Sequence, residues 1–127
     1  MMILFVCTGN TCRSAMAEAL LGHSLRQLGP DLSVVASAGT EGGSSPATDK
    51  AVDVLAARGI DLGGHRSRAL TAELVVDAEL IVAMTRRHEA AVTAMVPEAR
   101  SRTFLAGEVA RIGSGVGPVG EGGTAAW

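Results

Sequence analysis

The segment CTGNTCR, from Cys7 to Arg13, carries the residues with the clearest chemical potential in the chain. A cysteine thiolate is a strong nucleophile, and an arginine guanidinium presents a planar fork of donors that fits phosphate oxygens. A strand that ends at Cys7 and a helix that starts near Arg13 would bring the two groups to one point. We therefore predict a phosphate-binding loop in which Cys7 attacks a bound phosphoryl group.

The residues between these two would complete an anion site. The backbone N–H groups of residues 8–13 can converge on one point, and the N-terminus of the following helix adds partial positive charge, which also favours a thiolate at Cys7. Gly9 permits a tight or left-handed turn, Asn10 tolerates one and can brace it, and Ser14 can donate to the thiolate and cap the helix. The expected phosphate-binding residues are Thr8, Gly9, Asn10, Thr11, Cys12 and Arg13.

These residues also have ordinary structural explanations. A single cysteine at a strand end is usually a small buried hydrophobe, and a single arginine is usually solvated. The strand pattern before the segment, the helix pattern after it and the TGNT sequence inside it favour the phosphate-binding interpretation.

Apolar runs alternate along the chain with segments of helical periodicity, which is typical of an α/β fold. The all-apolar run at 3–6 suits a strand buried on both faces of a parallel sheet. We predict an open four-stranded parallel sheet with helices on both faces, and ligands bind such sheets beyond the carboxyl ends of the strands, where Cys7 lies. The expected strands are 3–6, 32–37, 79–84 and 101–107, and the expected helices are 14–29, 45–59, 71–78 and 85–96.

Capping residues set the expected helix starts. Ser14 is the expected cap of the first helix, Ser45 that of the second with Pro46 at its first helical position, and Thr71 that of the third. Residues 60–70 are expected to be a connection. The chain is expected to form one domain over 1–127, in which 109–127 is a Gly-rich tail.

Composition and charge argue against several functions. The length of 127 residues, 47% hydrophobic and 19% charged, suits one folded domain. A net charge of −2 gives no electrostatic reason to expect nucleic acid or an anionic membrane as partner, and the apolar start at 1–6 is too short for a membrane helix or a signal peptide. Two cysteines close together suggest neither a disulfide framework nor a zinc site, so we expect reduced thiols in the cytoplasm, no metal and no cofactor.

The opening ILFVCTGNTCRSAMAEAL resembles that of the low-molecular-weight protein tyrosine phosphatase family. The resemblance continues through SAGT, LAARGIDLGGHRSRAL, DAELIVAMTRRHEAAV and FLAGE, and covers roughly the first 108 residues. It implies that Cys7 forms a phosphocysteine and that Arg13 holds the phosphoryl oxygens and stabilises the transition state. The implied substrate is a phosphorylated protein, and phosphate-like oxyanions should bind the same loop.

The resemblance also assigns supporting roles. Asn10, Ser14, Ser37 and His65 match positions that brace the loop by hydrogen bonds, although His65 is alternatively an exposed loop residue. Cys12 matches a second loop cysteine that can pair with the nucleophile under oxidation and protect it, and its alternative is a small core-facing residue. His23 and His88 are interpreted as residues of helix surfaces and are assigned no role.

The chain departs from the family pattern near its end. Family members carry an Asp-Pro pair whose Asp protonates the leaving oxygen and then activates water. Here the last Asp is Asp77, and Pro118 follows Gly117. Glu121 is the nearest substitute acid, or alternatively a solvated tail residue, and without an acid turnover is expected to be impaired.

The family's C-terminal helix is also expected to be absent. A sheet face left partly open in that way would be covered by a partner or by self-association.

Four functions are compared. Hydrolysis of phosphotyrosine, or of small aryl phosphates, comes first. Thr11 resembles the residue of protein arginine phosphatases, and the absence of Tyr, with aromatics at only 2%, weakens the case for a phosphotyrosine-ring wall. Arsenate reduction needs distant cysteines, and the chain has none after Cys12. The last alternative is a phosphate-binding regulatory domain with weak or no activity.

Overall fold

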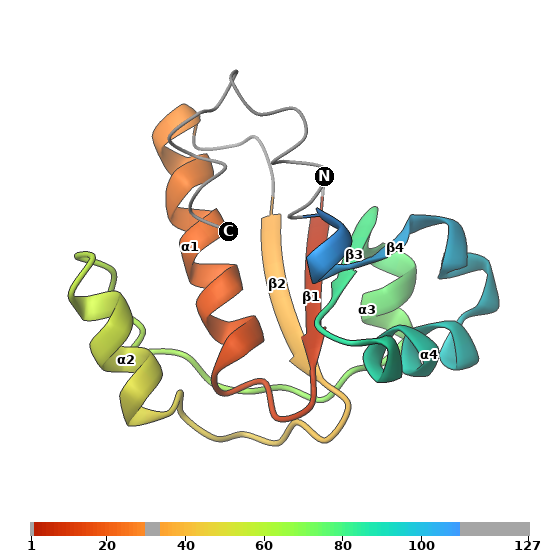
Figure 1. Ribbon diagram of the computed structural model, residues 1–127, viewed down its shortest axis with the longest axis horizontal. Coiled ribbons are helices and arrows are strands. Elements are labelled where there is room, and N and C mark those ends of the chain that lie inside the picture. The colour runs from red at the N-terminus through yellow and green to blue at the C-terminus, as the bar shows by residue number, and fades with distance from the viewer. Residues whose placement is uncertain (1, 30–33, 110–127) are drawn as a thin grey trace.

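Strand β1 (Met2–Cys7) lies at the centre of a parallel sheet that carries the predicted loop at its end. The computed structural model describes residues 2–29 and 34–109 (Figure 1). The strand order is β2-β1-β3-β4, where β2 is Val34–Gly39, β3 is Leu80–Ala83 and β4 is Thr103–Leu105, and every described pairing of these strands is parallel. The predicted four-stranded parallel sheet is confirmed.

Helices cover both faces of the sheet, as predicted. Alternate residues of β1 point to opposite faces: Leu4 and Val6 belong to the core cluster that contains residues of α3 (Ala72–Asp77) and α4 (Arg86–Met95). Ile3 and Phe5 belong to a second cluster, against which apolar residues of α1 (Arg13–Leu28) pack. This two-sided burial explains why the strand is apolar throughout.

Helix α2 (Asp49–Ala56) packs on α1 through a third cluster, which includes Ala51 and Leu55. A 3-10 helix, η1 (Pro97–Arg102), which the sequence did not indicate, joins α4 to β4. Residues 106–109 are helical. No described helix is long and apolar enough to span a bilayer.

Two predicted helix caps are wrong. Ser14 is the second residue of α1, whose N-cap is Cys12, and the Ser14 side chain is used in the loop instead. Ser45 and Pro46 precede α2, because Pro46 forms an isolated antiparallel bridge with Arg66 and holds this segment extended. Helix α2 therefore begins only after Thr48, whose side chain accepts a hydrogen bond from the Ala51 amide.

The boundaries of α3 and α4 agree with the prediction, whereas β2 runs two residues past its predicted end and β4 is limited to Thr103–Leu105, because η1 extends to Arg102 and residues 106–109 are helical. Thr71 caps α3 by accepting from the Leu74 amide, and α4 starts after Thr85 and ends before Pro97. Residues 110–127 lie outside the described residues, as do the expectations placed on them: most of the Gly-rich tail, the lost final helix, Gly117, Pro118 and Glu121.

Candidate active site

The loop between β1 and α1 turns sharply at Asn10, not at Gly9. Asn10 has φ 57° and is the one non-glycine residue with positive φ among the described residues. Asparagine tolerates this left-handed conformation because its side chain can bond to nearby backbone. The side chain of Asn10 is fully buried, and all its polar atoms have partners. Asn10 therefore shapes the loop and also ties it to the rest of the fold.

The direction of the hydrogen bonds around Asn10 follows from one backbone contact. The Arg68 amide donates to Asn10 Oδ1 over 2.9 Å, which fixes the orientation of the side-chain amide. The Nδ2 group then donates one hydrogen to Ser14 Oγ (2.9 Å) and the other to Ser37 Oγ (2.8 Å). Both serine hydroxyls accept from Asn10, so each keeps its own proton to donate elsewhere.

The hydroxyl protons of Ser14 and Ser37 are directed to different partners. Ser14 Oγ lies 2.8 Å from Cys7 Sγ and donates to the sulfur whenever the sulfur carries no proton, while Ser37 donates to the Glu18 carboxylate. The Asn10 amide also donates to Cys7 Sγ over 3.2 Å. Cys7 is buried, with 4% of its surface exposed, and its sulfur is held between the Ser14 hydroxyl and the Asn10 amide at the carboxyl end of β1.

His65 supports the loop from the connection between α2 and α3. Its Nε2 lies 2.7 Å from the carbonyl oxygen of Asn10, and a carbonyl can only accept, so the ring donates. The side chain is half-buried. Thus the geometry brings Asn10, Ser14, Ser37 and His65 together around the loop, and does not leave His65 as a free surface residue.

The end of β2 packs directly against the loop. Thr40 and Glu41 donate their amides to the carbonyl oxygens of Cys7 (2.8 Å) and Thr8 (2.9 Å). A Cβ added at Gly39 would lie 2.3 Å from the Thr8 carbonyl oxygen and 3.0 Å from the Asn10 nitrogen. Glycine is needed at this position because the two backbones pass in contact.

His88 is not the surface residue that the sequence suggested. It is only 2% exposed, and its Nε2 lies 2.8 Å from Thr8 Oγ1 in the loop. Its Nδ1 accepts from the Thr85 amide over 3.1 Å. Burial, then the positive charges of Arg13 and Arg87, hold the pKa of His88 below its usual 6.5. In contrast, His23 is half-buried on α1 and contacts Gln27.

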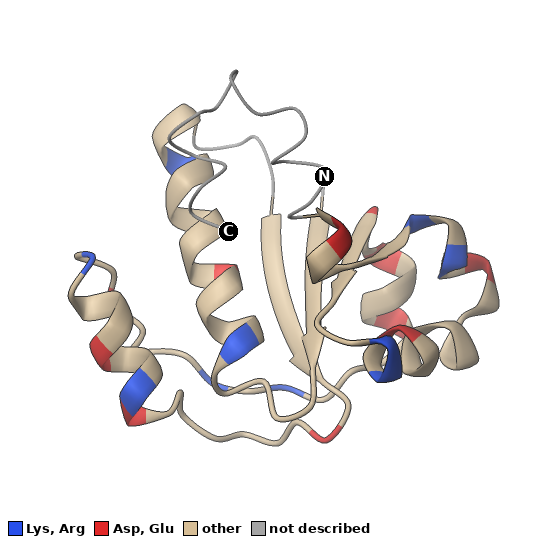
Figure 2. Cartoon of the chain, viewed as in Figure 1, with Lys and Arg blue, Asp and Glu red and all other residues tan. Residues whose placement is uncertain are grey.

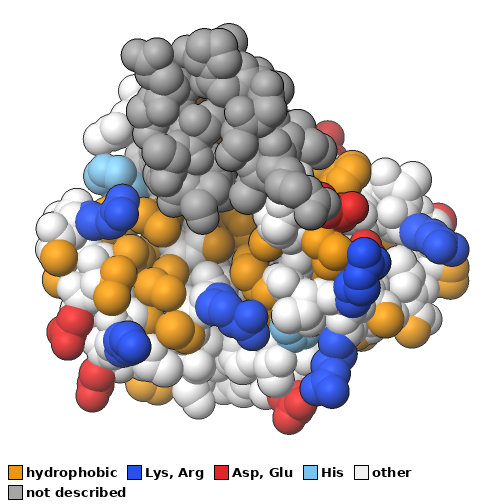
Figure 3. Space-filling model, viewed as in Figure 1, with side chains coloured by type: hydrophobic (Ala, Val, Ile, Leu, Met, Phe, Trp, Pro, Cys, Tyr) orange, Lys and Arg blue, Asp and Glu red, His pale blue; other side chains and the backbone are white. Residues whose placement is uncertain are grey.

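Arg13 is exposed at the first position of α1 and makes no hydrogen bond or ion pair with any other described residue. Figure 2 shows basic residues at this end of the sheet in the first turn of α1, in the connection before α3 and at the start of α4. By sequence they are Arg13, Arg66, Arg68, Arg86 and Arg87. In Figure 3, exposed Lys and Arg side chains lie at separate places across the face, several of them in its lower half. This distribution favours an anionic ligand despite the net charge of −2.

Cys12 faces the interface of α1 and α2. It is half-buried and packs against the third cluster, beside Met16. Both cysteines are free thiols. Thr11 is joined to the N-cap of α2 by its carbonyl oxygen, which accepts from the Thr48 amide over 2.9 Å. No group of three or more potential metal ligands occurs within residues 2–29 and 34–109.

Two site residues were missed from the sequence. Glu18 lies on α1 beyond the loop, and a single acidic residue within the apolar stretch AMAEALL was the available signal. His88 falls three residues after Thr85, where it completes a capping box with an uncommon residue. The place of Glu18 or of His88 in the sequence does not by itself indicate that the side chain contacts the loop.

The fold and site define a parallel α/β protein in which the loop after the first strand presents a cysteine and an arginine. A family model for low molecular weight phosphotyrosine protein phosphatases matches residues 2–111. The chain belongs to this family.

Individual relatives are bacterial phosphatases. The protein-tyrosine-phosphatase Etp of Escherichia coli K12 is 47% identical over 107 residues, which cover 84% of this chain and 69% of Etp. A protein-arginine-phosphatase of Bacillus subtilis is 38% identical over 102 residues, 80% of this chain and 67% of the relative. A structure of a cysteine-to-serine variant of the YwlE arginine phosphatase, whose active-site serine is phosphorylated, superposes with a TM-score of 0.74 at 40% identity, over 83% of this chain and 68% of that one.

Proposed function

We propose that this member of the family is a phosphoprotein phosphatase that hydrolyses phosphotyrosine through a phosphocysteine intermediate on Cys7. The observation that carries the proposal is the placement of Cys7 Sγ, which accepts from the Asn10 amide and the Ser14 hydroxyl beside the N-terminus of α1. The YwlE variant supports the proposal, because the active-site serine that is phosphorylated in that relative stands in place of a cysteine.

Two displacements at phosphorus make up the reaction. The Cys7 thiolate attacks phosphorus, the S–P bond forms, and the bond from phosphorus to the tyrosine oxygen breaks with both electrons on that oxygen. Water then attacks the phosphocysteine, releases inorganic phosphate and returns the thiolate. We assign to Arg13 and the amides of residues 8–13 the role of holding the phosphoryl oxygens in both steps.

The supporting roles are assigned from the hydrogen bonds. Ser14 stabilises the thiolate, Asn10 holds Ser14 in position, and Ser37 and His65 hold Asn10 from two other segments of the chain. Cys12 is assigned as the redox partner of Cys7 on the family resemblance. Because the mechanism needs a reduced nucleophile, we place the protein in the reducing cytoplasm.

The choice between phosphotyrosine and phosphoarginine as substrate rests on Thr11 and on which phosphatases the chain is similar to. One relative named above is a tyrosine phosphatase and the other an arginine phosphatase, so phosphoarginine on proteins is the second candidate substrate. The test is to measure release of phosphate from a phosphotyrosine peptide and from a phosphoarginine peptide of the same sequence. A faster kcat/KM on phosphoarginine would overturn the assignment to phosphotyrosine.

The intermediate itself is tested by trapping. Rapid quenching of the native chain with an aryl phosphate should give phosphate bound to Cys7, and Cys7→Ser should show no turnover of the aryl phosphate. Turnover by Cys7→Ser equal to that of the native chain would refute the mechanism. A burst of phosphocysteine that is not followed by turnover would instead favour a phosphate-binding regulatory domain.

The general acid is proposed from the sequence, since Gly117, Pro118 and Glu121 lie outside the described residues. We propose that Gly117 stands where an acid is needed and that turnover depends on the leaving group. A phenol of pKa about 10 leaves poorly without a proton, so phosphotyrosine should react more slowly than an activated aryl phosphate. Gly117→Asp should then raise the phosphotyrosine rate by up to about 10²-fold. A large loss in Glu121→Gln, with equal native rates on both substrates, would instead identify Glu121 as the acid.

A further inference from the structure

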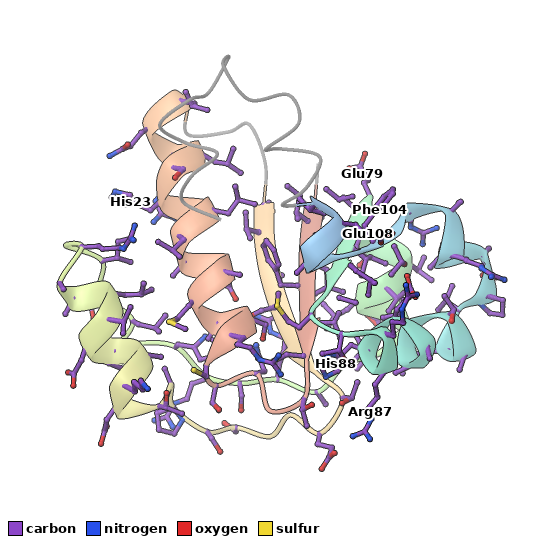
Figure 4. The ribbon with its side chains drawn as sticks, viewed as in Figure 1. His23, Glu79, Arg87, His88, Phe104 and Glu108 are labelled. Carbon is purple, nitrogen blue, oxygen red and sulfur yellow. The ribbon has the colours of Figure 1, made fainter. Side chains whose placement is uncertain are left out.

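The contact between His88 and Thr8 joins α4 to the residue that follows the proposed nucleophile. These residues are 80 positions apart, and the ring nitrogen and the hydroxyl oxygen lie 2.8 Å apart. Figure 4 shows His88 and Arg87 at the start of α4, at the end of the sheet where the loop lies. His88 is 2% exposed, so the ring is committed to contacts inside the protein.

The contacts at the other ring nitrogen define which atom carries the proton. A backbone amide can only donate, and the Thr85 amide lies 3.1 Å from His88 Nδ1, so Nδ1 must be the acceptor. The Thr85 hydroxyl, 3.0 Å from the same nitrogen, donates to it as well. The ring is therefore neutral with its hydrogen on Nε2, and it is Nε2–H that donates to Thr8 Oγ1.

We propose that His88 is a positioning residue of the phosphate site, which α4 holds in one tautomer so that it fixes Thr8 and thereby the backbone directly after Cys7. This inference rests on the proposed function, because it concerns the loop that binds the phosphoryl group. Thr8 accepts from His88, so its own hydroxyl proton is available to another acceptor. Its backbone is held separately, since its carbonyl oxygen accepts from the Glu41 amide.

Charged groups around the ring favour the same neutral form. Arg13 approaches from the start of α1 and Arg87 from α4, and both oppose a second positive charge on the ring. Cys7 is the titratable side chain of β1, and β3 and β4 carry none. On α4 itself, Glu89 pairs with Arg86 at 4.0 Å.

The 3-10 helix η1 also packs on α4, and it carries Glu98, Arg100 and Arg102. Arg102 donates to the carbonyl oxygens of Ala78 and Val75 and so is directed away from the ring. A protonated ring would in addition set Nδ1–H against the Thr85 amide.

Two amide substitutions separate the two ends of the ring. His88→Asn keeps an acceptor near the Nδ1 position and so preserves the cap of α4, but it cannot reach Thr8. His88→Gln places an amide donor near the Nε2 position, and its amide oxygen can serve the capping box, in which glutamine is a usual residue. A positioning role therefore predicts that phosphate affinity follows the donor to Thr8, while both variants keep an acceptor for the cap of α4.

Inorganic phosphate binding to the whole chain, measured by calorimetry together with thermal unfolding, tests this. His88→Asn should weaken phosphate binding by about 3- to 10-fold, the usual range for one net hydrogen bond, while His88→Gln should stay within about 2-fold of the native affinity. Affinity losses that follow the melting temperature, with His88→Gln as weak as His88→Asn, would overturn the proposal.

Thr8 supplies an independent variant if the His88 substitutions do not fold. Thr8→Val removes the acceptor at nearly constant shape, and Thr8→Ser keeps it. In a Thr8→Val background, His88→Asn should cause no further loss of phosphate affinity, and fully additive losses would contradict the contact. A native chain that binds no phosphate overturns the proposed function along with this inference. A native chain that binds phosphate, with unchanged affinity in Thr8→Val, overturns the role of His88 alone.

Discussion

Gly39→Ala should damage the active site without touching a proposed catalytic group. The new Cβ would stand 2.3 Å from the carbonyl oxygen of Thr8, whereas Cβ atoms essentially never approach another heavy atom within 3.0 Å. The obstacle is backbone and not the end of a flexible side chain. The strand cannot simply retreat, because the Gly39 amide and carbonyl are bonded to Arg68 and Leu70, each over 2.9 Å. The loop must therefore move away from β2.

The expected losses of stability and activity follow from the tight packing of the loop against β2. Overpacking of a well-packed interior typically costs about 1–3 kcal/mol of stability, so the variant should remain folded with a lower melting temperature. Thr8 is next to Cys7, and Asn10, whose nitrogen lies 3.0 Å from the same Cβ, donates to the nucleophile. A misplacement of about 1 Å can lower the rate by about 10²-fold, and we expect a loss of this order in kcat/KM on an aryl phosphate.

The matched control is Gly43→Ala. An added Cβ there meets nothing within 4 Å, so this variant should keep native activity and native or slightly higher stability. Steady-state kinetics and thermal unfolding of both variants make the comparison. If Gly39→Ala kept the native kcat/KM, or lost activity only to the extent that Gly43→Ala does, the contact between β2 and the loop would not define the site.

Three further outcomes follow from the site. Ser14→Ala removes the hydroxyl that lies 2.8 Å from Cys7 Sγ, and because a bond to a charged group contributes about 1.5–3 kcal/mol, kcat/KM should fall roughly 10- to 100-fold; a native kcat/KM would contradict the role assigned to Ser14. Arg13→Lys should weaken vanadate inhibition and turnover more than retained charge suggests, since lysine lacks the planar fork, and intact values would exclude Arg13 as the phosphate clamp. The third concerns pH and His88, whose pKa is lowered on folding by burial and by Arg13 and Arg87. Below pH 6.5 the unfolded chain takes up a proton at this position more readily than the folded one, so the stability contribution is present above 6.5 and is lost as pH falls towards the folded-state pKa. Chemical denaturation across this pH interval should show that the free energy of unfolding depends less on pH in His88→Asn than in the native chain. An equal pH dependence in the two proteins would refute the lowered pKa of His88.

Local patterns were sufficient to predict the sheet and the loop. The apolar run of β1 is buried on both faces, and the cysteine and arginine at its end are where the topology of a parallel sheet requires a ligand site. The cap at Thr71 and the start of α4 near Thr85 were predictable for the same reason, because a helix-start signal and the residues it affects lie within one turn of each other.

Contacts made across the fold were not visible in the same way. The interpretation of His88 as a surface residue failed because capping of α4 and contact with Thr8 both draw the ring inward, and the second contact spans 80 residues. The predicted start of the second helix, at Ser45, was too early for a related reason. Ser45 and Pro46 form a good local start signal, but pairing of Pro46 with Arg66 holds them extended.

The long-range contacts explain how a seven-residue motif can become a site. The loop is held by Ser37 on β2, by His65 and the Arg68 amide in the connection after α2, and by His88 on α4. Each of these is separated from the loop by at least one complete element, so the loop acquires its shape only when the sheet has assembled. Folding alone therefore places the loop amides and the Cys7 side chain, so that the proposed phosphate site would be preorganised.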